Sequence, residues 1–262
     1  KLGYSLVFNS DGTVTVYKVL KTTNTGSRYP VTKALSGGTD TGLGYITGGT
    51  DYSNGNICSN PSCNSCGSKA RCFQYTKTIP SEGLVIYALE NLWVEGTVKG
   101  RIIVAATNGN ANTNPNASGI TNNLMPNIYI ANNTRYSNGE VGVSGENADT
   151  LGLMAEGNII VPKNAPDPLY VDGALLAQNG FIAAPICYGG GSAKNNVYFF
   201  GSLILRGSWW FNFTNYCSSP SLTDGYLYPH FQWDTNLLYY PPPYFPASSV
   251  SAGLQMVKWT SE

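Results

Sequence analysis

A seven-residue pattern with glycine at its fifth position occurs three times in this chain. The copies are Leu92–Val98, Leu169–Leu175 and Val197–Leu203, and they align without a gap. Each copy reads as an extended strand, and each is followed within a few residues by a second apolar run. A strand–glycine–strand unit cannot bury its apolar face alone, so its repetition predicts units that stack on one another. We therefore expect an all-β fold and, within that class, a β-solenoid (β-helix).

The alternation of side chains along a strand predicts which residues of each copy form the core. In the first copy, Leu92, Val94 and Val98 should point inward. Trp93 and Glu95 of the same copy should point outward. The equivalent inward residues of the other copies are Leu169, Val171, Leu175, Val197, Phe199 and Leu203. The glycine of each copy should lie at a corner, where the backbone bends sharply.

The composition is typical of an exported β-protein with neutral, turn-rich surfaces. Charged residues make up 11% of the chain, which holds 30 Gly and 18 Tyr. Glycine or proline interrupts most windows that have helical apolar spacing. No window approaches the ~20 apolar residues of a membrane span. We therefore expect contact with a membrane only through a segment that precedes Lys1.

The pattern divides the chain into three expected parts. Residues 1–80 should form a small, irregular N-terminal subdomain that starts with a β-hairpin turning at Asp11-Gly12. Residues 81–213 should form the solenoid. Residues 214–262 should form a proline-rich cap, because the segment Leu237–Pro246 combines bulky apolar groups with prolines that cannot extend a sheet. Such a cap would lie over the last strand and protect its open edge.

Four of the six cysteines, Cys58, Cys63, Cys66 and Cys72, lie close together in the sequence. Four thiolates at short spacing could hold a structural zinc ion. Alternatively, they form two disulfides that hold a loop with little core of its own. We favour disulfides, because the rest of the chain suits an extracellular protein. We expect the remaining two, Cys187 and Cys217, to form a third disulfide.

Several segments resemble uncharacterised bacterial proteins that are grouped with the PilX-like minor pilins of type IV pili. The resemblance covers Ile79–Leu84, Leu92–Arg101, Gly152–Pro162, Leu175–Gly180 and the ending Asn236–Pro246. It implies a β-solenoid that follows a pilin-like membrane helix, with other pilins or the pilus filament as partners. A relative by architecture is a β-solenoid minor pilin of the pilus tip that binds DNA. The resemblance supplies no catalytic residue and no cofactor.

An enzyme is one alternative, because many secreted β-helices act on polysaccharides through clustered carboxylates. Glu95 and Asp172 occupy the same position of two copies, and their carboxylates would lie roughly 5 Å apart if those copies were neighbours. That separation resembles the pair of a retaining glycosidase. The long stretch between the two copies argues against direct stacking. The lone His230 has no Gly-x-Ser-x-Gly partner motif, so we expect no catalytic residue, cofactor or metal.

A binding module is the other alternative. Trp93, Tyr170 and Tyr198 occupy equivalent outward positions, and a column of aromatic rings can stack sugar rings or bases. These rings could equally pack against covering loops. Residues 81–262 hold seven basic and twelve acidic residues, which disfavours duplex DNA. We expect a non-enzymatic, extracellular domain of a pilus-associated minor pilin for adhesion or capture of a glycan or DNA. A secreted polysaccharide-active β-helix and a DNA-binding pilus-tip module are the alternatives.

Overall fold

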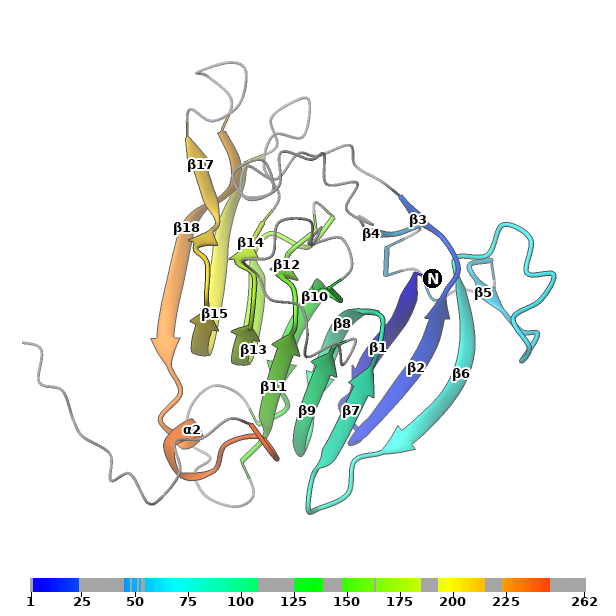
Figure 1. The fold of residues 1–262 in the computed structure, drawn as a ribbon, viewed down its shortest axis with the longest axis horizontal. Helices are drawn as coiled ribbons and strands as arrows, with labels where there is room; N and C mark the ends of the chain where they lie inside the picture. The colour runs from blue at the N-terminus through cyan, green and yellow to red at the C-terminus, as the bar shows by residue number, and fades with distance from the viewer. Residues whose placement is uncertain are drawn as a thin grey trace, which may run out of the picture.

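The computed structural model is almost entirely β. It describes residues 2–23, 45–47, 49–50, 52, 55–107, 125–138, 148–162, 164–184, 193–214 and 223–245. Within these residues, sixteen strands form one sheet and two short strands, β3 (Thr22–Thr23) and β4 (Tyr45–Ile46), form another (Figure 1). The expected all-β class is confirmed. No helix in this described part of the chain is long and apolar enough to cross a membrane.

A column of parallel strands runs through most of the molecule, and we call it the first column. Its strands are, in order, β1 (Gly3–Asn9), β8 (Asn91–Val98), β10 (Ile128–Tyr136), β13 (Leu169–Ala177), β15 (Lys194–Leu205) and β18 (Thr223–Trp233). Beyond β1 the sheet continues through β2 (Thr13–Val19), β6 (Arg71–Thr78) and β5 (Ile57–Cys58). The pair β1–β2 is antiparallel, so the expected hairpin is confirmed, and β1 joins it directly to β8.

Two further columns lie beside the first. The second column contains β7 (Leu84–Ala88), β9 (Arg101–Ala106), β11 (Thr150–Ala155) and the second halves of β13 and β15. The third column runs from the first residues of β10 through β12 (Ile159–Ile160), β14 (Ile182–Ala183) and β16 (Trp209–Trp210). All of these pairs are parallel. The short β17 (Asn212–Thr214) pairs antiparallel with the start of β18.

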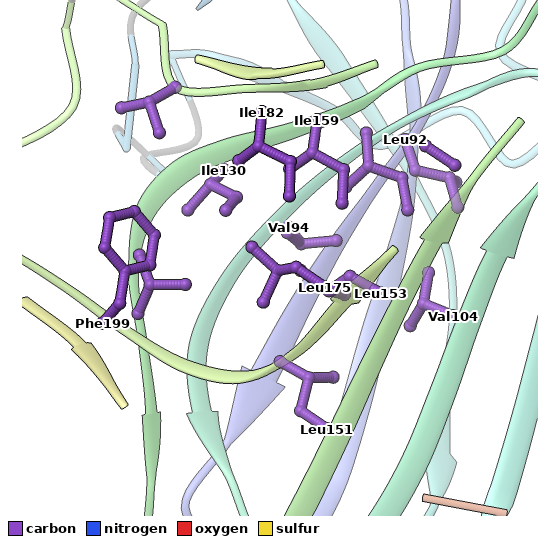
Figure 2. Packing of buried hydrophobic residues seen from close by; sticks show 14 of the residues in the cluster. Leu92, Val94, Val104, Ile130, Leu151, Leu153, Ile159, Leu175, Ile182 and Phe199 are labelled. Atoms are coloured by element: carbon purple, nitrogen blue, oxygen red, sulfur yellow. The ribbon is translucent and has the colours of Figure 1, made fainter. Parts of the chain in front are cut away.

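The second and third copies of the repeat pair residue for residue. Leu169–Ala177 lies beside Val197–Leu205 with no shift of register. Of the predicted inward residues, Leu203 is partly buried and packs against the main core. The others are buried within that core: Leu92, Val94, Val98, Leu169, Val171, Leu175, Val197 and Phe199. In Figure 2, such side chains from different strands point toward one another. Burying an aliphatic side chain of this size contributes about 1.5–3 kcal/mol, so this core is the main source of stability.

Glycine is required where β13 and β15 pass from the first column to the second. Gly173 and Gly201 face each other and have φ angles of +148° and +147°, which L side chains rarely adopt. A Cβ atom on Gly201 would lie 1.9 Å from the carbonyl oxygen of Gly173. The expected role of the glycine as a corner residue is therefore explained by both backbone conformation and close approach.

A row of asparagines crosses the starts of successive strands. The backbone N–H of Asn127 donates to Oδ1 of Asn91 (2.8 Å), and that of Asn158 donates to Oδ1 of Asn127 (2.7 Å). The N–H of Phe181 donates in turn to Oδ1 of Asn158 (3.1 Å). Each amide thus satisfies a backbone donor of the next strand, which fixes how the strands stack.

A second apolar cluster covers the outer side of the first and third columns. Trp93, Tyr129, Ile160 and Phe181 belong to it, and Val19, Ile46 and Ala70 of the N-terminal part pack against them. Trp93 thus points away from the main core as predicted, yet it is 0% exposed because this N-terminal part lies over it.

The proline-rich segment lies along the side of the sheet rather than over the last strand. It contains the one-turn helix α2 (Asn236–Tyr239), and Phe245 packs against Ile103 of β9 and Ala174 of β13. Nη2 of Arg101 donates to the carbonyl oxygen of Pro241 (2.8 Å). The outer side of the second column is apolar at this point. The segment that we expected to cover the end of the solenoid covers this side of the second column instead.

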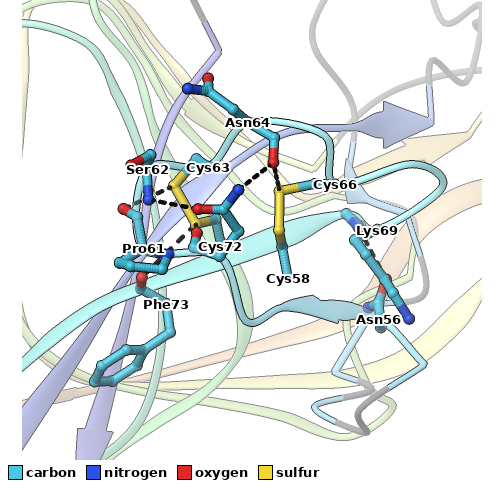
Figure 3. Close-up of a disulfide and its surroundings, with 12 residues drawn as sticks. Asn56, Cys58, Pro61, Ser62, Cys63, Asn64, Cys66, Lys69, Cys72 and Phe73 are labelled. Atoms are coloured by element: carbon cyan, nitrogen blue, oxygen red, sulfur yellow. Dashed lines mark hydrogen bonds between the residues drawn. A yellow bond between two sulfur atoms is a disulfide. The ribbon is translucent and has the colours of Figure 1, made fainter.

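Two disulfides join the clustered cysteines, Cys58 to Cys66 and Cys63 to Cys72 (Figure 3). The preference for disulfides is therefore confirmed for these four residues. Cys187 and Cys217, for which we predicted a third disulfide, lie outside the described residues.

Candidate ligand-binding face

Four side chains stack on the outer side of the first column, and we call them the aromatic ladder: Arg135, Tyr170, Tyr198 and His230. The rings of Tyr170 and Tyr198 lie 5.0 Å apart with planes 11° apart, and those of Tyr198 and His230 lie 4.5 Å apart with planes 10° apart. Cζ of Arg135 lies 4.4 Å from the ring centre of Tyr170. The in-register pairing of β13, β15 and β18 places the three rings in line.

The ladder is accessible to a ligand. Tyr170 and Tyr198 are half-buried and His230 is exposed. β17 pairs only with Thr223–Gly225 of β18, so no described strand pairs with the outer edge of β18 at His230. Within the described residues, part of each tyrosine side chain and part of the His230 side chain therefore remain exposed.

Polar groups line the open end of the ladder. Nε2 of His230 lies 3.0 Å from Oδ1 of Asn196. The N–H groups of Asn195 and Asn196 donate to the carboxylate of Asp167 at 2.8 and 3.1 Å. Partial burial raises the pKa of Asp167, but the hydrogen bonds from Asn195 and Asn196 outweigh it and leave the pKa lowered. Asp167 is therefore an ionised acceptor at neutral pH.

Of the three predicted ligand-binding residues, Tyr170 and Tyr198 lie together and Trp93 does not. The ring of Trp93 stacks on that of Tyr129 at 4.8 Å inside the second apolar cluster. The register of β10 shifts between Ile130 and Thr134, which interrupts the aromatic column at this strand. Trp93 is thus a packing residue, which is the alternative that its sequence position left open.

Sequence reasoning missed two members of the ladder, Arg135 and His230. His230 lies in a run in which Tyr226, Tyr228 and His230 alternate with other residues, as a strand requires. That alternation could have indicated β18, but Pro229 argued against a strand. Arg135 belongs to no repeated motif, so no sequence signal pointed to it.

The predicted carboxylate pair is not assembled. Glu95 is on β8 and Asp172 is on β13, and β10 lies between these strands. Tyr52 donates its hydroxyl to Glu95, and the N–H of Tyr136 donates to Asp172 (2.7 Å). Both residues are buried, with 4% and 1% of their whole surface exposed. Burial raises the pKa of Glu95, and the nearby Tyr52 and Arg71 offset part of this rise.

No protein-family model, no curated protein and no solved structure matches this chain. The face must therefore be interpreted from its own chemistry. Its stacked rings and polar rim can bind a ligand that offers both apolar and hydroxyl groups.

Proposed function

We propose that the protein captures a glycan on the aromatic ladder and acts as a non-enzymatic adhesion module. The observation that carries this proposal is the stack of Tyr170, Tyr198 and His230, which is ordered by strand pairing and open to solvent at His230. Because these side chains are already ordered before a ligand binds, binding costs less conformational entropy. A stack held by the sheet is therefore suited to recognition.

The groups around the ladder match the hydroxyls of a sugar better than the phosphates of DNA. The Asp167 carboxylate and the Asn196 amide can accept and donate hydrogen bonds, and the ring of His230 offers an apolar face. Arg135 brings one cation, and Lys194 is held by the carbonyl oxygen of Ala165. Duplex binding depends on neutralising several phosphates, so a face that also carries Asp167 is poorly suited to it.

Replacing Tyr198 by alanine should weaken glycan binding about tenfold, because one aromatic contact contributes ~1–3 kcal/mol and its loss leaves a gap in the stack. The measurement is calorimetric titration with oligosaccharides selected on a glycan array. The matched control is Tyr87→Ala, an exposed tyrosine on β7 (56% exposed). Unchanged binding in Tyr198→Ala, or equal loss in Tyr87→Ala, would sink the proposal, as would saturable binding of DNA alone. Thermal unfolding of both variants checks that they are folded.

We further propose that the three columns are the faces of a β-solenoid and that the protein is displayed outside the cell on a pilus-associated minor pilin. Support comes from the parallel, in-register columns, from two disulfides, which are typical of oxidising compartments, and from the resemblance described above. The partners would be other pilins or the filament. An experimentally determined structure in which successive coils are traced tests the winding.

Immunogold electron microscopy of intact cells tests the location. With an antibody against residues 80–262, we expect label along filaments or at their tips. Label that is spread over the envelope, or found only in the medium, would contradict the pilus assignment. Glycan binding would remain open in that case, because it depends on the ladder alone.

A further inference from the structure

An apolar groove lies at the end of the second column, beside the last residues of β15. Its volume is about 680 Å³, and the residues that line it include Leu203, Leu205, Trp209, Phe231 and Trp233. The two tryptophans and Phe231 are each about half exposed. Large apolar side chains that gather in one exposed place on a protein mark a surface that another segment or molecule covers.

The groove arises because the last strand of the first column does not continue into the second column. β13 and β15 each run through a glycine from the first column into the second. β18 instead ends at Trp233, which is paired with Gly201. The next residue, Asp234, is buried and accepts a hydrogen bond from the N–H of Asn236 (2.9 Å), where α2 begins. No described strand therefore pairs with the outer edge of Ser202–Leu205.

This edge of β15 offers what a further strand would need. Leu203 and Leu205 lie opposite Leu175 and Ala177 of β13, which are 0% exposed, yet both are only partly buried. The N–H of Arg206 donates to the carbonyl oxygen of Ala177 (3.3 Å), toward β13. Alternate residues of a strand turn their N–H groups to opposite sides, so those of Leu203 and Leu205 point away from β13. The edge thus presents apolar side chains and backbone donors together.

The sequence contains a segment that matches this edge. Leu254–Trp259 reads Leu-Gln-Met-Val-Lys-Trp and contains neither glycine nor proline. A single polar residue separates Leu254 from Met256, as a single residue separates Leu203 from Leu205. A strand that places Leu254 beside Leu203 also places Met256 beside Leu205, with both side chains on the inward face.

The position of Phe245 brings this segment within reach of the edge. Phe245 is the last residue that the structure describes, and it shares an apolar cluster with Ala174, which lies opposite Ser202. The next strand position beyond β15 lies two strand spacings from β13, or roughly 10 Å. Residues 246–253 connect Phe245 to Leu254, and eight extended residues span about 27 Å. Five of these eight are Ser, Gly or Pro, which suits a connection.

We propose that Leu254–Trp259 pairs in parallel with Ser202–Leu205 and covers the apolar groove as the last strand of the second column. All other strand pairs of this column are parallel. The added strand occupies an edge that would otherwise be open to a second copy of the chain. This inference is independent of the glycan proposal, because no ring of the aromatic ladder lines the groove.

A cross-link between the two segments tests the pairing and the identity of the added strand. The double variant Ile204→Cys/Gln255→Cys places one thiol on each strand at facing positions, at a separation that a disulfide bridges. Oxidised glutathione takes two electrons and two protons from the two thiols and becomes two molecules of glutathione. We expect the link to form within one chain, as located by mass spectrometry of proteolytic fragments.

The matched control is Ile204→Cys/Ser249→Cys, whose second thiol lies in the connection. It should form its link about tenfold more slowly, because that thiol has a lower effective concentration at the edge. Equal rates in the two variants would overturn the proposal. A link that joins two chains would also overturn it, and would assign the edge to a second copy.

Hydrogen exchange in the full chain gives a second measurement. Met256→Asp places a charge in the groove, so the N–H groups of Leu203 and Leu205 should exchange about tenfold faster. The N–H of Leu153, which lies between β9 and β13, should keep its rate. Gln255→Asp changes a residue on the outer face and should leave all three rates as in the wild type. Wild-type exchange of Leu203 and Leu205 in Met256→Asp would contradict the pairing.

Discussion

Replacing Gly201 by alanine should destabilise the protein by about 3–5 kcal/mol, which is a large fraction of the stability of an ordinary domain. Two causes act together. The φ angle of +147° is strained for any L side chain, and the new Cβ atom would collide with the carbonyl oxygen of Gly173 at 1.9 Å. Because the Cβ position is fixed by the backbone of β15 and the carbonyl oxygen belongs to the backbone of β13, the two strands would have to separate. Urea unfolding followed by tryptophan fluorescence measures the loss.

Gly67→Ala is the matched control. Gly67 also has a positive φ angle, +58°, but a Cβ atom added there would have no neighbour within 4 Å. This substitution adds no collision, and an L side chain at this left-handed φ costs only about 1 kcal/mol. If Gly201→Ala were no more destabilising than Gly67→Ala, the close stacking of β13 on β15 would be contradicted.

Replacing Arg71 by methionine should cost about 3–5 kcal/mol near neutral pH, because it leaves a buried carboxylate without its cation. Nη2 of Arg71 lies 3.9 Å from Oε1 of Glu95, and the two side chains are 1% and 5% exposed. The guanidinium also lies over the ring of Tyr52, with Cζ 4.4 Å from its centre, and donates to the carbonyl oxygen of Gly49. Methionine keeps much of the volume, so the charge is the main change. Chemical denaturation of the variant and the wild type gives the difference.

The pH dependence of this loss distinguishes the charge from the packing. Burial raises the pKa of Glu95 above its ordinary value of 4.5. A raised pKa in the folded state means that the favourable contribution of this group is present below pH 4.5 and is lost as the pH rises through the folded-state value. Without Arg71 that pKa should rise further. The deficit of Arg71→Met should therefore be smaller at acidic than at neutral pH.

A second substitution checks the same explanation. Adding Glu95→Gln to Arg71→Met should recover much of the stability near neutral pH, because the neutral amide can still accept a hydrogen bond from the Tyr52 hydroxyl without the cost of a buried charge. A deficit that does not change with pH and is not recovered by Glu95→Gln would mean that Arg71 acts through packing alone.

The repeat made the core predictable. Leu169, Val171, Val197 and Phe199 could be placed inward because strand alternation determines which face each residue occupies. The two copies align without a gap, which determines the register of their pairing. The corner at Gly201 was predictable for the same reason. The neighbours of the first copy, on β8, were harder to predict, because β10 lies between β8 and β13 and does not contain the glycine pattern.

What covers each face could not be predicted. Trp93 and Tyr170 occupy the same position of the repeat, yet only Trp93 is fully buried, because the N-terminal part packs over it through contacts between distant residues. β6 and β18 were missed since a cysteine cluster and Pro229 are signals against strands. Proline is tolerated in an edge strand, and among the described residues β18 pairs at Pro229 only with β15. The ladder residue His230 was missed with it.

The most direct test of the proposed glycan capture uses the only histidine in the chain, His230. Its imidazole gives one set of side-chain signals in a heteronuclear NMR spectrum, so no assignment among several histidines is needed. Titration with an oligosaccharide that binds in calorimetry should shift these signals with the same saturation curve. Binding that saturates in calorimetry while the His230 signals stay unchanged would contradict the aromatic ladder as the site of capture.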